Sequence, residues 1–150
     1  MCASRAPVPE GYPRDMGIQE TAISSPVVAA FGGRVFGLDP STGRVLWEHE
    51  VGSHTPRIIV TDTRVFVAGN QLLCLTYPDG AVVWKQEQYT SLGATFILSE
   101  GRLLSGSGGE VVCYSAIHGE LLWTNKFPGK GSAEVALGTP FNAMQMDNNT

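Results

Sequence analysis

One short pattern occurs three times in this chain at a nearly constant spacing. A glycine is followed by one variable residue, two aliphatic residues and a tryptophan, so that the three copies end at Trp47, Trp84 and Trp123. The tryptophans are 37 and 39 residues apart. Self-similarity at a period of about 20–50 residues is typical of repeat architectures, in which neighbouring units stack to bury a shared core. The repeat therefore constrains the fold more strongly than any single residue does.

Each repeat contains four short apolar runs separated by turn-forming residues. In the second repeat these runs cover residues 58–60, 64–68, 71–75 and 80–84. Short β-branched and aliphatic runs bounded by Gly, Pro, Asn and Asp predict strands joined by hairpins. No window has the apolar spacing of a long helix. Four antiparallel strands in a repeat of about 38 residues predict an all-β protein built from β-propeller blades.

The segment leading to the first tryptophan resembles the tryptophan-docking motif of the pyrroloquinoline-quinone (PQQ)-like propeller repeats. That motif holds a small residue, an Asp, a Thr-Gly pair and a Trp, and the first repeat has Gly37, Asp39, Thr42, Gly43 and Trp47 in these places. The later repeats keep the turn glycine and the tryptophan, which are Gly80 with Trp84 and Gly119 with Trp123. The chain is similar to this family over about residues 17–150.

We expect the motif to have a structural role. A turn glycine suits the positive φ of a tight hairpin, and Asp and Thr side chains can bond nearby backbone groups. A tryptophan offers a flat apolar face that buries about 150–250 Å². The three tryptophans are therefore predicted to occupy equivalent buried sites between adjacent blades, each on the last strand of its blade.

Cys74 and Cys113 fill the small position of the motif in the second and third repeats. Equivalent positions in stacked sheets are about 10 Å apart, which is too far for a disulfide. The third cysteine, Cys2, forms no Cys-x-x-Cys spacing with them. We therefore expect Cys74 and Cys113 to be small buried residues without a metal or redox role.

The repeats do not add up to a closed propeller. Residues 1–16 form an N-terminal extension, residues 17–51, 52–88 and 89–127 form whole repeats, and residues 128–150 form a partial one. Closed propellers typically have 4–8 blades, and this chain has about three and a half. It is predicted to be an open arc, part of a larger propeller, or a chain completed by others. Self-association, most simply as a dimer joined by like ends or head to tail, or binding to another propeller chain, is expected.

Composition excludes several other functions. The net charge of −4, the pI near 5.3 and the lack of a basic cluster argue against nucleic acid or an anionic membrane as partner. The apolar runs are far shorter than the roughly 20 residues of a transmembrane helix. No signal peptide is recognised, which favours the cytoplasm, or a secreted or periplasmic location if the chain is truncated.

No catalytic residue, metal ligand or cofactor is predicted. His49, His54 and His118 lack a metal-ligand spacing and are expected on an outer strand, in a linker and in a docking turn. Quinone-dependent dehydrogenases of the resembling family use a calcium ion, a quinone stacked on Trp and adjacent cysteines. This chain has no adjacent cysteine pair and no position-matched calcium ligands. The resemblance therefore implies the fold and not the chemistry.

Three functions remain open at this point. The first is a non-enzymatic propeller module that acts in assembly or protein binding. The second is a fragment or subunit of a quinone- or sugar-binding enzyme whose site forms only on ring completion, and the third is a small-ligand-binding propeller assembled from subunits. Candidate binding residues lie in the linkers between repeats and the turns between second and third strands, which should gather at one end. They are His54, Arg57, Tyr89 and Lys130.

Overall fold

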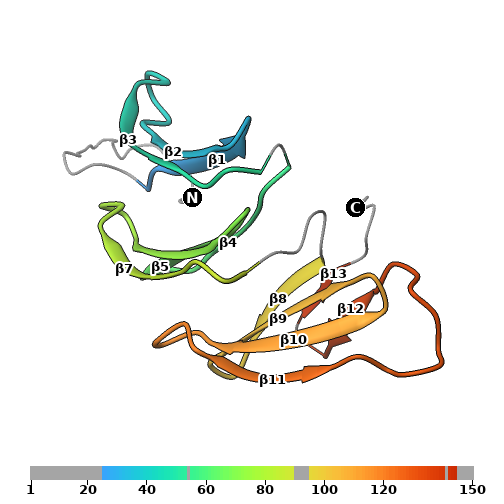
Figure 1. Cartoon of the computed structure of the whole chain (residues 1–150). Coiled ribbons are helices and arrows are strands. Elements are labelled where there is room, and N and C mark those ends of the chain that lie inside the picture. Colours follow the sequence, from blue (N-terminus) through green and yellow to red (C-terminus); the bar gives the residue numbers. More distant parts are fainter. Residues whose placement is uncertain (1–24, 54, 90–94, 141, 145–150) are drawn as a thin grey trace.

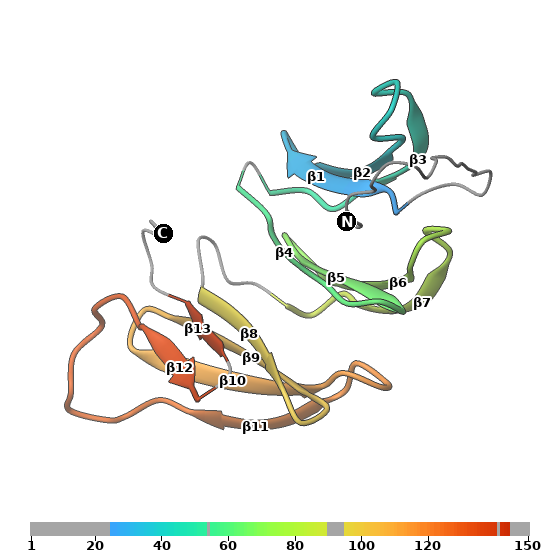
Figure 2. The same ribbon diagram turned by 180° about the vertical axis from the view of Figure 1, so that it is seen from behind.

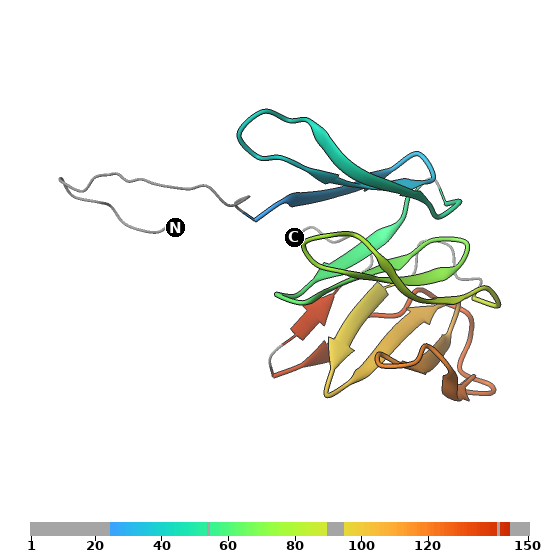
Figure 3. The same cartoon turned by 90° about the vertical axis from the view of Figure 1, so that its left-hand side faces the viewer.

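The chain forms a stack of antiparallel sheets that follow one another in sequence order (Figure 1). The computed structural model describes residues 25–53, 55–89, 95–140 and 142–144, and every regular element within these ranges is a β-strand. No long apolar helix of the kind that crosses a membrane is found in these ranges. Seen from the side, the first, second and third sheets lie one above another (Figure 3).

The strands of each sheet are hydrogen-bonded in their order along the chain. The first sheet contains β1 (Val27–Phe31), β2 (Arg34–Leu38) and β3 (Val45–Glu50). The second contains β4 (Arg57–Val60), β5 (Arg64–Ala68), β6 (Leu72–Thr76) and β7 (Val82–Gln86). The third contains β8 (Thr95–Ser99), β9 (Arg102–Ser107), β10 (Glu110–Ser115) and β11 (Leu121–Asn125). A two-stranded sheet pairs β12 (Leu137–Thr139) with β13 (Asn142–Met144).

The second and third sheets confirm the predicted four-stranded blade. The first sheet has three strands in the described part of the chain, and the apolar residues 21–23, which the repeat pattern suggests as its fourth strand, lie outside that part. The apolar run at residues 133–137, which the sequence pattern suggests as the first strand of the partial repeat, forms a strand only from Leu137, where β12 begins, so that expectation is wrong for residues 133–136. The reason is that Val135 packs against the third sheet: its carbonyl accepts a hydrogen bond from Thr95 Oγ1 at 2.9 Å, and its side chain lies over Gly106, which has none.

The core consists of two apolar layers, one on each face of the second sheet. Strand β6 alternates between them, because Leu73 and Leu75 pack toward the first sheet while Leu72 and Cys74 pack toward the third. All four side chains are at most 1% exposed. A sheet covered on both faces needs apolar residues at every position of its inner strands, which explains the continuous apolar runs in the sequence.

Candidate functional site at the blade junctions

The small residue of each docking motif lies directly across from the tryptophan of the same blade. The cross-strand pairs are Gly37 with Trp47, Cys74 with Trp84 and Cys113 with Trp123. In all three blades the strand register shifts immediately after the small residue. Such a bulge re-aims the side chains beside it. In the first blade the indole fills the space so fully that a Cβ on Gly37 would lie 2.3 Å from a Trp47 ring carbon.

Trp47 joins the first blade to the second. Its indole Nε1 donates a hydrogen bond to the carbonyl of Pro78 at 2.8 Å. Its ring lies on Gly80, where an added Cβ would be 2.3 Å from Trp47 Cδ2. Gly80 also has a φ of +76°. Glycine is therefore required here for two independent reasons, the backbone conformation and the space taken by the indole.

Trp84 repeats this contact between the second and third blades. Its Nε1 donates to the carbonyl of Ala116 at 3.1 Å. Its ring lies on Gly119, which has a φ of +83° and would place a Cβ 2.5 Å from Trp84 Cε3. The ring of Phe66 lies 6.3 Å from Trp84 on its own blade. The junction is thus a repeated unit in which one blade supplies an indole and the next supplies a glycine turn.

The residue two positions after Trp47 and the residue two positions after Trp84 each provide a second bond across the junction. Nε2 of His49 lies 2.6 Å from the carbonyl oxygen of Gly80 and, because a carbonyl only accepts, donates to it. Nε2 of Gln86 donates to the carbonyl of Gly119 at 3.0 Å. His49 lies on an outer strand as predicted, but sequence reasoning missed its part in the junction. The sequence feature that could have revealed this bond is the alignment of His49 with Gln86. Both stand two residues after a repeat tryptophan, and both side chains carry a nitrogen donor.

Polar side chains fix the docking turn itself. In the first turn Asp39 Oδ1 accepts hydrogen bonds from the backbone N–H of Ser41 at 2.9 Å and from its hydroxyl at 2.8 Å. The backbone bond from Ser41, followed by the hydroxyl bond, holds the pKa of Asp39 below its usual value. Thr42 Oγ1 accepts from the backbone N–H of Arg44 at 3.1 Å. Asp39 and Thr42 therefore have the structural role that the resemblance implied.

Where later repeats replace the Asp, the replacement still bonds the turn. Thr76 Oγ1 accepts from the backbone N–H of Ala81 at 3.0 Å. Ser115 Oγ accepts from the backbone N–H groups of Ile117 and His118 at 3.2 and 3.1 Å. The second and third repeats therefore lack the motif's Asp but keep a side-chain oxygen, from Thr76 and Ser115, that accepts hydrogen bonds from the turn backbone.

The third tryptophan differs from the other two. Trp47 and Trp84 are half-buried, whereas Trp123 is 44% exposed. The prediction that all three tryptophans are equivalently buried is wrong for Trp123, because no docking turn covers it within the described residues. Gly43, in the turn of the first blade, has a φ of +78°, and a Cβ added there would meet no described residue within 4 Å.

The predicted binding-loop residues do not form one surface group in the described structure. Arg57 begins β4 and is half-buried, Lys130 is exposed, and His54 lies outside the described residues. Tyr89 was expected in a surface loop but is only 1% exposed. Its hydroxyl lies 2.7 Å from Ser105 Oγ, and its ring packs edge-on against Tyr114 at 5.7 Å. Tyr89 is therefore part of the core between the second and third blades.

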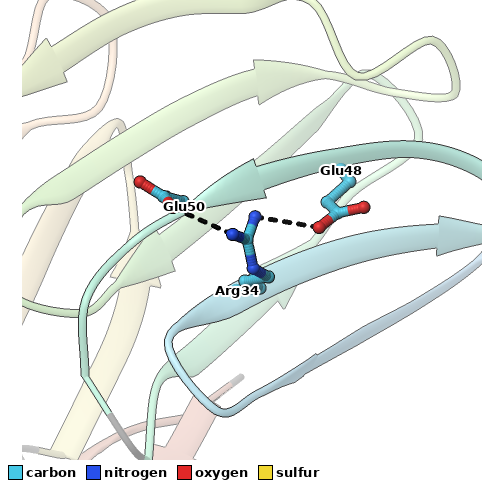
Figure 4. A network of polar contacts seen from close by, with 3 residues as sticks. All are labelled: Arg34, Glu48 and Glu50. Carbon is cyan, nitrogen blue, oxygen red and sulfur yellow. Dashed lines mark hydrogen bonds and ion pairs between the residues drawn. The ribbon is translucent and has the colours of Figure 1, made fainter.

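Two further polar features lie on the surface. Arg34 on β2 bridges Glu48 and Glu50 on the neighbouring strand β3 at 2.8 and 2.9 Å (Figure 4). These side chains are largely exposed, so the ion pairs contribute little to stability.

A cleft of about 820 Å³ opens at the end that carries the turns between first and second strands, and Arg64 and Glu100 are among its lining residues. This end is opposite to the one predicted to hold the binding loops.

The two described cysteines serve packing. Cys74 and Cys113 are fully buried and unbridged, and burial raises the pKa of the Cys74 thiol to about 11 and that of the Cys113 thiol in the same direction. Among the described residues, no group of three or more His, Cys, Asp or Glu side chains is placed to hold a metal ion.

Comparison with known proteins agrees with this geometry. The family profile described as outer membrane protein assembly factor BamB matches residues 16–78, 32–94 and 68–147. No curated protein matches the chain in sequence. Among solved structures, the computationally designed Ika8 protein has a TM-score of 0.54 and 14% identity, covering 75% of this chain and 39% of its own. It supports the propeller fold and nothing beyond the fold.

Two natural proteins show weaker structural similarity. A europium-containing methanol dehydrogenase has a TM-score of 0.49 and 16% identity, covering 69% of this chain and 23% of its own. BamB from Moraxella catarrhalis has a TM-score of 0.44 and 20% identity, covering 69% of this chain and 46% of its own. The chain thus matches less than half the length of each of these structures.

Substituting a docking glycine tests the junction. Gly80→Ala and Gly101→Ala introduce the same methyl group at φ values of +76° and +78°, but only Gly80 lies under an indole. The shared backbone strain costs about 1–2 kcal/mol, and overpacking against Trp47 adds about 1–3 kcal/mol at Gly80 alone. Urea unfolding measures the difference. Equal loss of stability in the two variants would contradict the docking contact.

Burial of the Cys74 thiol predicts a pH dependence. The unfolded thiol ionises near its ordinary value of 9.0, and the folded one only near 11. Between these values the unfolded state binds fewer protons, so the free energy of unfolding falls as pH rises above about 9. Cys74→Ala removes this contribution and flattens the decline between pH 8 and 10.5, as measured by urea unfolding.

Proposed function

The chain belongs to the PQQ-like propeller repeat family described as outer membrane protein assembly factor BamB, and on this basis we propose that it is a non-enzymatic propeller module that acts by binding polypeptides. The family supplies the blade architecture. The proposal about function depends on what the open faces of this particular stack present to a partner.

The observation that carries the proposal is the exposed junction face of the third blade. Trp123 is 44% exposed, and Leu121 on the same strand is 54% exposed. At the two internal junctions the position of Trp123 is covered by a turn of the next blade. An exposed apolar patch usually marks an interaction site. Since the chain covers this same position with polypeptide twice, a polypeptide is the partner that this face fits best.

A second candidate function is supported by the cleft between the second and third blades. Its volume of about 820 Å³ is that of a small-molecule site. It combines apolar side chains such as Phe66 and Leu98 with the charged groups of Arg64 and Glu100. A chain that is one subunit or fragment of a quinone- or sugar-binding enzyme would use such a cleft once the ring is complete.

Solution mass tests the first candidate. We expect the purified chain to associate with itself as its concentration rises, because the open junction face is most simply covered by another copy. Light scattering and sedimentation across a hundredfold range of concentration would measure this. A stable monomer throughout that range would count against self-association and would favour an arc completed by a different propeller chain.

An activity assay separates the two candidates. We expect no dye-linked oxidation of alcohols or sugars when PQQ and calcium are added to the purified chain, because its two described cysteines are buried beside tryptophans rather than placed next to each other. A quinone-dependent dehydrogenase purified and loaded in the same way is the positive control. Turnover that depends on both additions would establish the enzyme alternative.

A further inference from the structure

We propose that the cleft between the second and third blades binds a small molecule that carries one carboxylate on an apolar body, with Arg64 holding the carboxylate. The inference goes beyond polypeptide binding and does not depend on it, because Trp123 is not among the residues that line the cleft. The cleft is lined by described residues between Thr61 and Pro140.

The cleft lies where the first strands of neighbouring blades end. Strands β4 and β8 contact each other, and β12 and β13 lie beside β8 (Figure 2). The turns that follow β4, β8 and β12 supply Thr63, Gly101 and Pro140 to the lining. A volume of about 820 Å³ is in the range of pockets that enclose a small molecule. The size of the cleft therefore suits a small ligand rather than a folded partner.

The local hydrogen bonds hold Arg64 at the edge of this cleft. Arg64 begins β5 and is half-buried, and its Nη1 donates to the carbonyl of Thr63 at 3.0 Å. The hydroxyl oxygen of Thr61 accepts from the backbone N–H groups of Arg64 and Thr63 at 2.9 and 3.2 Å. Because the turn is already fixed in this way, binding costs less conformational entropy than it would in a loose loop.

Arg64 has donors left for an anion. No ion pair between Arg64 and a carboxylate occurs in the part of the chain that the structure describes. Glu100 also lines the cleft, but its side chain is 87% exposed and its Oε1 lies 4.0 Å from Arg102. A guanidinium has several N–H donors in one plane, and two of them match the two oxygens of a carboxylate.

The remaining lining favours a ligand with an apolar body. Phe66 is 3% exposed, Leu98 is half-buried and Ile117 is 68% exposed, and all three line the cleft. The backbone N–H and carbonyl of Ala116, another lining residue, are already hydrogen-bonded within the protein. Covering these apolar side chains removes carbon surface from water, which favours binding.

Charge balance favours a carboxylate over a phosphate. Among the described lining residues Arg64 is the only lysine or arginine, and Glu100 adds a negative charge. A phosphate monoester carries about two negative charges at neutral pH, which one arginine beside a glutamate does not balance. A single carboxylate carries one negative charge and is matched by one guanidinium.

Isothermal titration calorimetry with octanoate tests the ligand class. We expect octanoate to bind the purified chain at one molecule per chain. Octanamide lacks the charge, acetate lacks the apolar body and octyl phosphate carries the larger charge, so each should bind at least about tenfold more weakly, the scale of one charged hydrogen bond. No binding of octanoate at millimolar concentration, equal binding of octanamide, or tighter binding of octyl phosphate would each overturn the proposal.

Removing the charge of Arg64 tests the site. Arg64→Gln should weaken octanoate binding at least about tenfold and leave binding of octanamide unchanged. The control Arg34→Gln makes the same change at an arginine that is paired with Glu48 and Glu50 and does not line the cleft, so it should leave both affinities unchanged. Equal octanoate affinity in these two variants would show that the ligand binds elsewhere and would overturn the assignment.

A second variant changes an exposed residue and so leaves the core intact. Ile117→Asp removes apolar lining and adds a negative charge at the cleft, and it should weaken octanoate binding at least about tenfold. Val45→Asp is the control, because Val45 is 48% exposed on β3 and does not line the cleft. Octanoate bound equally well by both variants would contradict the proposal. Self-association is measured separately by light scattering, so failure of the ligand site would leave polypeptide binding standing.

Discussion

An indole lying on a glycine turn is the contact on which the arrangement of this protein depends. Trp47 on Gly80 and Trp84 on Gly119 place each sheet at a defined position over the next, because the flat ring fits only where the turn lacks a Cβ. Hydrogen bonds from Nε1 to turn carbonyls then fix the direction of the ring. Apolar layers between sheets supply most of the burial, but they are non-directional and would not by themselves set the relation of one blade to the next.

Because each blade contacts only its neighbours, the two ends of the stack necessarily differ from its middle. The middle blade both gives an indole and receives one, the first leaves its turn open, and the third leaves Trp123 exposed. Among the described residues, Trp123 and the 39–43 turn are thus the places where half of this contact is present without the other half.

Several residues whose types are common in catalytic or binding sites have structural roles here. Cys74 fills the small position across from Trp84, Tyr89 lies in the core with its hydroxyl bonded to Ser105, and His49 bonds the carbonyl of Gly80. Each satisfies a local requirement of the repeat: a small buried side chain, a paired buried hydroxyl or a donor across the junction. The cleft near Arg64 and Glu100 is independent of these contacts.

The sequence by itself determined the blades, their order, the outer-strand position of each tryptophan and the requirement for Gly80 and Gly119, because these follow from local patterns that recur in register. Only the tertiary structure decided which blade covers which tryptophan, that Tyr89 is buried, and that Val135 packs against the third sheet before β12 begins at Leu137. The difference is physical. Strand and turn formation depends on neighbours along the chain, whereas burial depends on whether another blade lies beside the residue. The pattern around Trp123 is the same as around the other two tryptophans, so it could not reveal that Trp123 is exposed.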